Sequence, residues 1–135
     1  MEKTPEPQNH QKIVLVVDDD AAVLKSVSAI LADGNYKVLT ASNGPSALRQ
    51  SREFENDIHL LLSDFEMTGM NGMDLATQMT RDRPDLKVLL MSGFPDGMLV
   101  LNEGWHYLAK PFIPSQLRTL ISGLVFPQKP SKFST

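Results

Sequence analysis

Short apolar runs and longer stretches with helical spacing alternate along the chain. The apolar runs predict strands over 13–17, 36–41, 58–64, 86–91 and 105–109. In most of the intervening stretches, and after the last run, apolar residues recur every three or four positions. This spacing predicts helices over about 21–33, 45–54, 73–83 and 114–125.

Proline and glycine mark several boundaries of these elements. Pro45 and Pro114 suit the first turn of a helix, and Pro84 ends the helix before it. The stretch 94–104 is interrupted by proline and glycine, so it has room only for a short helix over 98–103.

The sequence pattern of each predicted strand indicates how deeply that strand is buried in the sheet. The runs 13–17 and 58–64 are apolar almost throughout, which is typical of strands covered on both faces. The run 36–41 mixes polar and apolar residues and therefore suits a sheet edge.

Alternating strands and helices predict an α/β fold, a doubly wound five-stranded parallel sheet with helices on both faces. We expect one domain over 12–125, with a flexible lead over 1–11 and a flexible tail over 126–135.

Composition narrows the class of protein. The 135 residues are 41% hydrophobic, which is enough for one core, and the net charge of -3 argues against a broad nucleic-acid surface. There is no cysteine, and the three histidines lie in no metal-binding spacing. No apolar run approaches the roughly 18 residues of a membrane span. We therefore expect a cytoplasmic protein without direct nucleic-acid binding or membrane contact.

Acidic residues end two of the predicted strands. Asp18 and Asp19 follow the first strand, and Asp64 ends the third. Ligands of open parallel sheets bind at this carboxyl edge, and the three acids meet there if the two strands are neighbours. Packed carboxylates repel one another unless a cation offsets their charge. A donor set made only of oxygen atoms favours Mg²⁺ (or Mn²⁺) as that cation. The next acid, Asp20, could equally be only a helix cap.

Two further polar side chains end strands at the same edge. Ser92 follows the fourth strand and offers a hydroxyl donor, and Lys110 follows the fifth and offers an ammonium group. Metal, hydroxyl and ammonium together could stabilise a phosphoryl group carried by an aspartate, a known nucleophile in phosphoryl transfer.

This set of motifs, in this order and spacing, resembles the receiver domain of bacterial response regulators, the CheY-like fold. The resemblance covers about 12–125. The motifs that carry it are Val16-Val17-Asp18-Asp19, Asp64 followed by Met67 and Gly69-Met70-Asn71-Gly72, Met91-Ser92-Gly93, and Tyr107-Leu108-Ala109-Lys110-Pro111-Phe112.

The resemblance implies a strand order of 2-1-3-4-5 and a role for each acid. Asp64 would be the phosphoacceptor, with Asp18 and Asp19 as the acidic pair. Mg²⁺ would be held by this acidic cluster, with Asp19, Asp64 and the backbone carbonyl of Glu66 as its direct ligands.

The resemblance also implies roles for residues on the last two strands. Ser92 would be the switch hydroxyl, Lys110 the phosphate-binding lysine and Tyr107 the switch aromatic. A cis peptide bond is implied before Pro111. On strand spacing alone, core or half-buried aromatics are the more common interpretation of Tyr107 and Trp105, ahead of a switch role.

The chain departs from the family pattern in three places. Thr68 replaces the usual proline four residues after the phosphoacceptor. Glu66 adds an acid beside the site, and its side chain could turn inward, towards the phosphoryl group or the metal, or outward. The segment between Ser92 and Lys110 is short, so we expect the fourth helix to be short or irregular.

The expected function is that of a signalling switch and not of a classical enzyme, although it can assist its own phosphorylation and dephosphorylation. The expected partners are a histidine kinase or histidine phosphotransfer protein and an unknown downstream protein. The chain would be a monomer or a phosphorylation-dependent dimer. A stand-alone relay protein is the first interpretation, and a receiver excised from a hybrid histidine kinase or larger regulator is the alternative.

Two hypotheses from other classes are open. A Mg²⁺-dependent phosphohydrolase could use Asp64 as its nucleophile, although the haloacid-dehalogenase type would want aspartate at position 66, where this chain has glutamate. A phosphorylation-independent interaction module would bind its partner equally well after Asp64→Asn.

Overall fold

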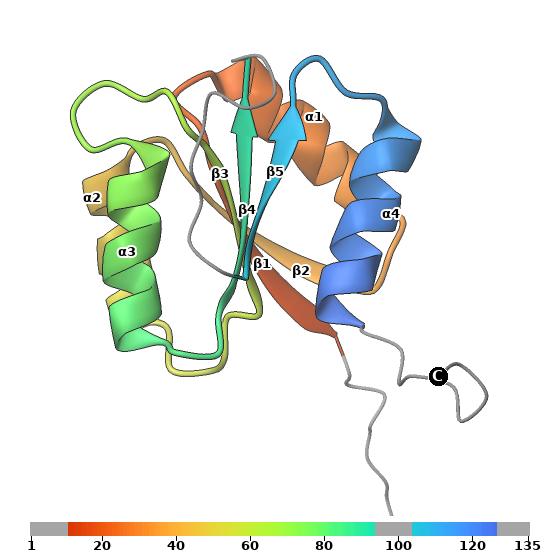
Figure 1. Cartoon of the computed structure of the whole chain (residues 1–135). Helices are drawn as coiled ribbons and strands as arrows, with labels where there is room; N and C mark the ends of the chain where they lie inside the picture. The colour runs from red at the N-terminus through yellow and green to blue at the C-terminus, as the bar shows by residue number, and fades with distance from the viewer. Residues whose placement is uncertain (1–10, 94–103, 127–135) are drawn as a thin grey trace, which may run out of the picture.

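The computed structural model describes residues 11–93 and 104–126 (Figure 1). This part of the chain contains five strands and four helices. The elements in chain order are β1 (Lys12–Val17), α1 (Ala21–Ala32), β2 (Tyr36–Ala41), α2 (Gly44–Glu53), β3 (Leu60–Asp64), α3 (Gly72–Asp82), β4 (Lys87–Ser92), β5 (Trp105–Ala109) and α4 (Pro114–Val125).

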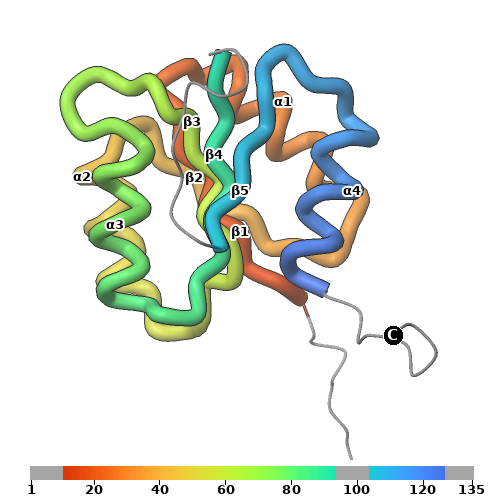
Figure 2. The backbone as a smooth tube through the Cα atoms, viewed as in Figure 1, coloured from red at the N-terminus to blue at the C-terminus, as the bar shows by residue number. Residues whose placement is uncertain are grey.

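The strands form one parallel sheet in the order β2-β1-β3-β4-β5. Helices α2 and α3 cover one face, and α1 and α4 cover the other (Figures 1 and 2). The predicted fold class and strand order are therefore confirmed. The mixed strand 36–41 is β2, at the sheet edge, as its pattern predicted.

Burial on both faces explains why β3 is apolar at successive positions. Successive side chains of a strand point to opposite faces. Leu61 packs in the core beneath α2 and α3, whereas Leu60 and Leu62 pack in the core beneath α1 and α4. Every residue of β3 is buried, including Ser63 and the terminal Asp64.

Polar side chains begin three of the helices. Asp20 caps α1 by accepting a hydrogen bond from the Ala22 N–H at 2.9 Å, so it fills the structural role that its position suggested. Asn43 caps α2 in the same way. Asn71 begins α3 in a capping box with Asp74. Helices α1 and α2 therefore begin within a few residues of the carboxyl ends of β1 and β2, whereas a longer loop, 65–71, separates β3 from α3.

The strand predicted from Ile58 begins only at Leu60. The Ile13 N–H donates to His59 Nδ1 at 3.0 Å, so a side chain replaces a ladder hydrogen bond at this point. The short helix predicted over 98–103 lies outside the described residues, as do the predicted lead (1–11) except residue 11 and the predicted tail (126–135) except residue 126. The last predicted helix, 114–125, is α4 with the same bounds.

Arg83, at the end of α3, forms hydrogen bonds with the end of α2 and the loop that follows it. Its guanidinium donates to Ser51 Oγ at 3.1 Å and to the backbone carbonyls of Ser51, Phe54 and Asn56 at 2.8, 2.9 and 3.0 Å. Carbonyl groups at a helix C-terminus lack partners within the helix, and a cation there also complements the helix dipole. The planar five-donor guanidinium can serve several acceptors at once, which an ammonium group cannot do in the same geometry.

Arg83→Lys should therefore lower the free energy of unfolding by about 1–3 kcal/mol. Urea denaturation measures this loss. The control is Arg49→Lys, at an exposed position on α2, which should change stability by less than about 0.5 kcal/mol. Equal stability of the two variants would show that the carbonyl contacts of Arg83 contribute nothing specific.

Candidate acidic and phosphate-binding site

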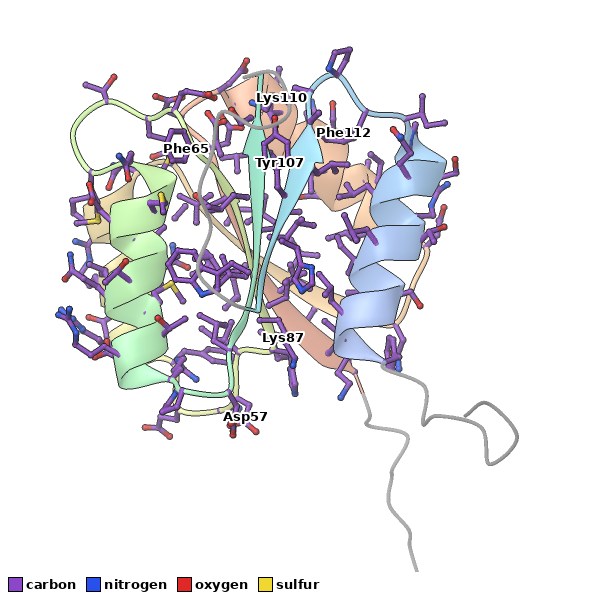
Figure 3. The ribbon with its side chains drawn as sticks, in the orientation of Figure 1. Asp57, Phe65, Lys87, Tyr107, Lys110 and Phe112 are labelled. Carbon is purple, nitrogen blue, oxygen red and sulfur yellow. The ribbon has the colours of Figure 1, made fainter. Side chains whose placement is uncertain are left out.

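The predicted site residues end neighbouring strands at one edge of the sheet. Asp18 and Asp19 follow β1, Asp64 ends β3, Ser92 ends β4 and Lys110 follows β5. Parallel pairing in register brings these strand ends together. Figure 3 shows Lys110 and Tyr107 near this end of the sheet, with Asp57 and Lys87 at the opposite end.

Lys110 forms the central ion pairs of the site. Its Nζ donates to Asp64 Oδ1 at 3.0 Å and lies 3.6 Å from Asp18 Oδ2. The peptide bond between Lys110 and Pro111 is cis, as the resemblance implied. One ammonium group therefore faces two buried carboxylates.

The three acids form a compact cluster. Asp18, Asp19 and Asp64 each present an oxygen, and these atoms all lie within 4.8 Å of one another. Asp18 and Asp64 are only 1% and 4% exposed, whereas Asp19 is exposed. The Thr68 N–H approaches Asp19 Oδ2 at 3.5 Å, a long contact that the proline of the family pattern could not make because it has no N–H.

The pKa values of Asp18 and Asp64 show that burial disfavours the charged form of both carboxyl groups. Burial raises the pKa of Asp64 to about 6; the hydrogen bond from Lys110 opposes this rise, and the charge of Asp18 adds to it. Burial likewise raises the pKa of Asp18. Burial lowers the pKa of Lys110, but its contacts with Asp64 and Asp18 outweigh this effect and raise it overall. The ammonium is thus held in its charged form and opposes the repulsion, and burial is the main cause of the raised pKa values of Asp18 and Asp64.

A glycine at the start of α3 allows close packing against the end of β3. A Cβ atom on Gly72 would lie only 2.4 Å from the backbone oxygen of Asp64. Any side chain at this position would force the α3 terminus away from the acidic cluster. Gly72 therefore belongs to the framework that positions Asp64.

Glu66 turns inward, which decides between the two orientations that its sequence position allowed. The buried Ser92 hydroxyl donates to Glu66 Oε2 at 2.5 Å. The sequence pointed to Ser92 and Glu66 separately, but their contact could not be predicted, because it depends on the path of the loop after β3.

Tyr107 lies beside the same strand end. Its side chain is half-buried, and its hydroxyl donates to the backbone oxygen of Ser92 in a long contact of 3.5 Å. Trp105, also half-buried, packs against the core beneath α2 and α3. Tyr107 is thus a half-buried aromatic, as strand spacing predicted, and it also contacts the strand end at the site.

The acidic cluster fits a hard divalent cation. It offers carboxylate oxygens from three residues, and Asp18 Oδ2 is buried without a hydrogen-bond partner among the described residues. The Lys110 ammonium lies 3.6 Å from this oxygen, beyond hydrogen-bond distance, so a closer cation would offset the remaining cost of burying it. Mg²⁺ prefers such oxygen ligands and retains several waters, which the exposed side of the cluster at Asp19 would allow.

The fold and the strand-end cluster together define a doubly wound α/β domain with an acidic, lysine-containing site. The sequence matches the family model of the response regulator receiver domain over residues 14–122. The chain therefore belongs to the response regulator receiver domain family of two-component systems.

Individual relatives agree with this assignment. The chain is 37% identical over 113 residues to the two-component response regulator ARR14 of Arabidopsis thaliana, covering 79% of this chain and 29% of that protein. It is 28% identical over 129 residues to the sensor kinase CckA of Brucella abortus, covering 93% of this chain and 14% of that protein. The chain thus spans less than a third of the length of these curated relatives.

Solved structures show the same fold. A receiver domain protein from Clostridium thermocellum superposes with a TM-score of 0.77 at 28% identity, covering 85% of this chain and 94% of that one. The receiver domain of the hybrid histidine kinase CckA gives a TM-score of 0.75 at 27% identity, covering 84% of this chain and 98% of that one.

The helices of the described residues include none with the length and apolar character of a membrane span.

The raised pKa of Asp64 predicts that Asp64→Asn stabilises the folded chain at neutral pH. The folded state holds the Asp64 proton up to a pKa of about 6, against an ordinary 3.8, so wild-type stability falls as pH rises through this range. Asparagine stays neutral and avoids this loss. In EDTA at pH 7.5 the variant should be more stable by about 1–3 kcal/mol, and the difference should vanish near pH 4.

Urea denaturation across this pH range measures the difference. Asp57→Asn is the matched control, because Asp57 is exposed and lies at the opposite end of the sheet (Figure 3). If Asp64→Asn were less stable than the wild type at pH 7.5, the ion pair with Lys110 would outweigh carboxylate burial, contrary to this account.

Proposed function

We propose that Asp64 accepts a phosphoryl group from a histidine kinase or histidine phosphotransfer protein, and that the product switches a protein-interaction surface. The observation that carries this proposal is the 3.0 Å contact between Lys110 Nζ and Asp64 Oδ1 at the edge of a three-aspartate cluster. This contact places a nucleophilic oxygen of Asp64 beside a cation for the phosphoryl oxygens, Lys110, and beside a set of metal ligands.

In the transfer step, an Asp64 carboxylate oxygen attacks phosphorus and forms a new P–O bond. The P–N bond of a phosphohistidine donor breaks, and the imidazole leaves with the bonding electron pair. Lys110 supplies positive charge beside the developing negative charge on the phosphoryl oxygens. The Ser92 hydroxyl lies on the neighbouring strand end and can donate to one of these oxygens once it is released from Glu66.

Mg²⁺ is the cofactor that this site suits best. The side chains of Asp18, Asp19 and Asp64, with the backbone carbonyl of Glu66, would hold it. When bound, it supplies charge neutralisation for the transferring phosphoryl group. Asp18 and Asp64, both buried, contribute charge that is weakly screened by solvent, so they favour a divalent cation over a monovalent one.

The surface beside Lys110 suits a protein donor. A shallow hollow lies between α1 and the loop after β5, lined mainly by apolar atoms of Ala22, Val23, Pro111 and Phe112, with Lys110 at its edge. Phe112 lies close to Lys110 (Figure 3). A donor protein that brings its phosphohistidine to Asp64 would cover this hollow, and apolar burial would add to its affinity.

The phosphorylated state carries about one to two additional negative charges at the sheet edge. Ser92 and Tyr107, which are in contact at this edge, are the residues through which the added charge would reach the surface beside β5. The domain would then act as a two-state switch for a downstream protein, biased by its phosphoryl group. The similarity to the sensor kinase CckA favours one alternative, in which this receiver works as part of a hybrid kinase.

Incubation with acetyl phosphate and Mg²⁺ should add one phosphoryl group to the wild-type chain and none to Asp64→Asn. Intact-mass spectrometry measures the addition. Lys110→Ala should slow labelling by about 10- to 100-fold, because a charge-assisted contact to the phosphoryl oxygens is lost. Asp57→Asn, at the far end of the sheet, should be labelled like the wild type.

The rival classes give different results in the same assay. A phosphohydrolase would release many equivalents of phosphate per chain, and an interaction module would not be labelled. Equal labelling of wild type and Asp64→Asn would place the acceptor elsewhere and refute the proposal.

A further inference from the structure

The hydrogen bond between Ser92 and Glu66 couples the end of β4 to the loop after β3. Ser92 is fully buried, whereas Glu66 is exposed and reaches back from the rim of the site. The Ser92 hydroxyl donates to Glu66 Oε2 over a short donor–acceptor distance of 2.5 Å. Glu66 is therefore more than a solvated acid near the site.

This contact competes with phosphate binding. A serine hydroxyl has a single proton to donate, so Ser92 cannot bond Glu66 and a phosphoryl oxygen at the same time. Phosphorylation of Asp64 would therefore require Ser92 to exchange one anionic acceptor for another.

The strand register explains why residue 66 can reach this hydroxyl. Asp64 is the register partner of Met91, so Ser92 lies one residue beyond the last paired position of β3. The chain turns after Asp64, and a side chain two residues later can approach the end of β4. Aspartate at this position would be one methylene shorter, so its carboxylate would fall short of the same hydroxyl.

We propose that Glu66 is a positioning residue that holds the Ser92 hydroxyl in the unphosphorylated state and so sets the threshold for phosphorylation of Asp64. This inference rests on the proposed function and adds a regulatory contact to the same site. The proposed effect of Glu66 requires the Ser92 hydroxyl, whereas an effect of its negative charge alone would not require that hydroxyl.

A double-mutant cycle tests this dependence. The four chains are wild type, Glu66→Ala, Ser92→Ala and the double variant, each titrated with acetyl phosphate at saturating Mg²⁺. The fraction phosphorylated at steady state is measured by intact mass. Glu66→Ala should lower the half-saturating acetyl phosphate concentration about fivefold or more when Ser92 is present, and by less than about twofold when residue 92 is alanine.

The variant Glu66→Asp keeps the negative charge at position 66 but shortens the side chain. It therefore separates the effect of side-chain length from the effect of charge, with Ser92 unchanged. If Glu66 holds the hydroxyl, the shorter acid should shift the titration in the same direction as Glu66→Ala. If only the negative charge matters, Glu66→Asp should match the wild type. Glu55→Ala removes an exposed acid in the loop after α2 and should leave the titration unchanged.

The outcomes distinguish this inference from the proposed function. A wild-type chain that takes up no phosphate would overturn both. A labelled wild type with equal shifts in the two Ser92 backgrounds, or with Glu66→Asp equal to wild type, would overturn the role of Glu66 alone. A large shift confined to chains that retain the Ser92 hydroxyl, with Glu66→Asp resembling Glu66→Ala, would support it.

Discussion

The burial of two carboxylates within a three-aspartate cluster is the constraint on which the site depends. Asp18, Asp19 and Asp64 place oxygens within 4.8 Å of one another, two of the three side chains are buried, and Lys110 supplies a single positive charge against them. Burial disfavours the charged forms of Asp18 and Asp64, as the raised pKa values of these two acids show. Such a cluster is poised to take up further positive charge.

The fold imposes this arrangement through its central strands. The two cores hold β1, β3 and β4 between layers of helices, so the polar groups at their carboxyl ends cannot spread apart. Gly72 lets α3 pack directly against the backbone of Asp64, and Asp20 starts α1 immediately after the acidic pair. Stability gained in the apolar layers thus offsets the cost of the buried charges, a pattern expected where function requires unfavourable local electrostatics.

Much of this architecture could be predicted from the sequence, because its signals are local. The apolar run before Asp64 predicted a doubly covered strand, and the mixed run 36–41 predicted a strand at the sheet edge. The acidic cluster followed from parallel topology on the condition that the first and third strands are neighbours. The resemblance supplied the strand order, which periodicity alone does not contain.

Features that depend on side-chain reach across the chain could not be predicted in the same way. The His59 imidazole replaces a ladder bond and shortens β3, and Arg83 joins the ends of two helices; neither contact leaves a periodic signal. The inward turn of Glu66 was one of two orientations compatible with its position, and only the path of the loop decides between them.

The central claim is that the charge of this cluster is balanced by a divalent cation at Asp64. The most direct measurement is the pKa of the Asp64 carboxyl, followed by ¹³C NMR in EDTA and then in excess Mg²⁺. The account predicts a pKa near 6 in EDTA and a clear decrease when Mg²⁺ is added, because a bound cation favours the ionised carboxylate. A pKa that is the same under both conditions would contradict it.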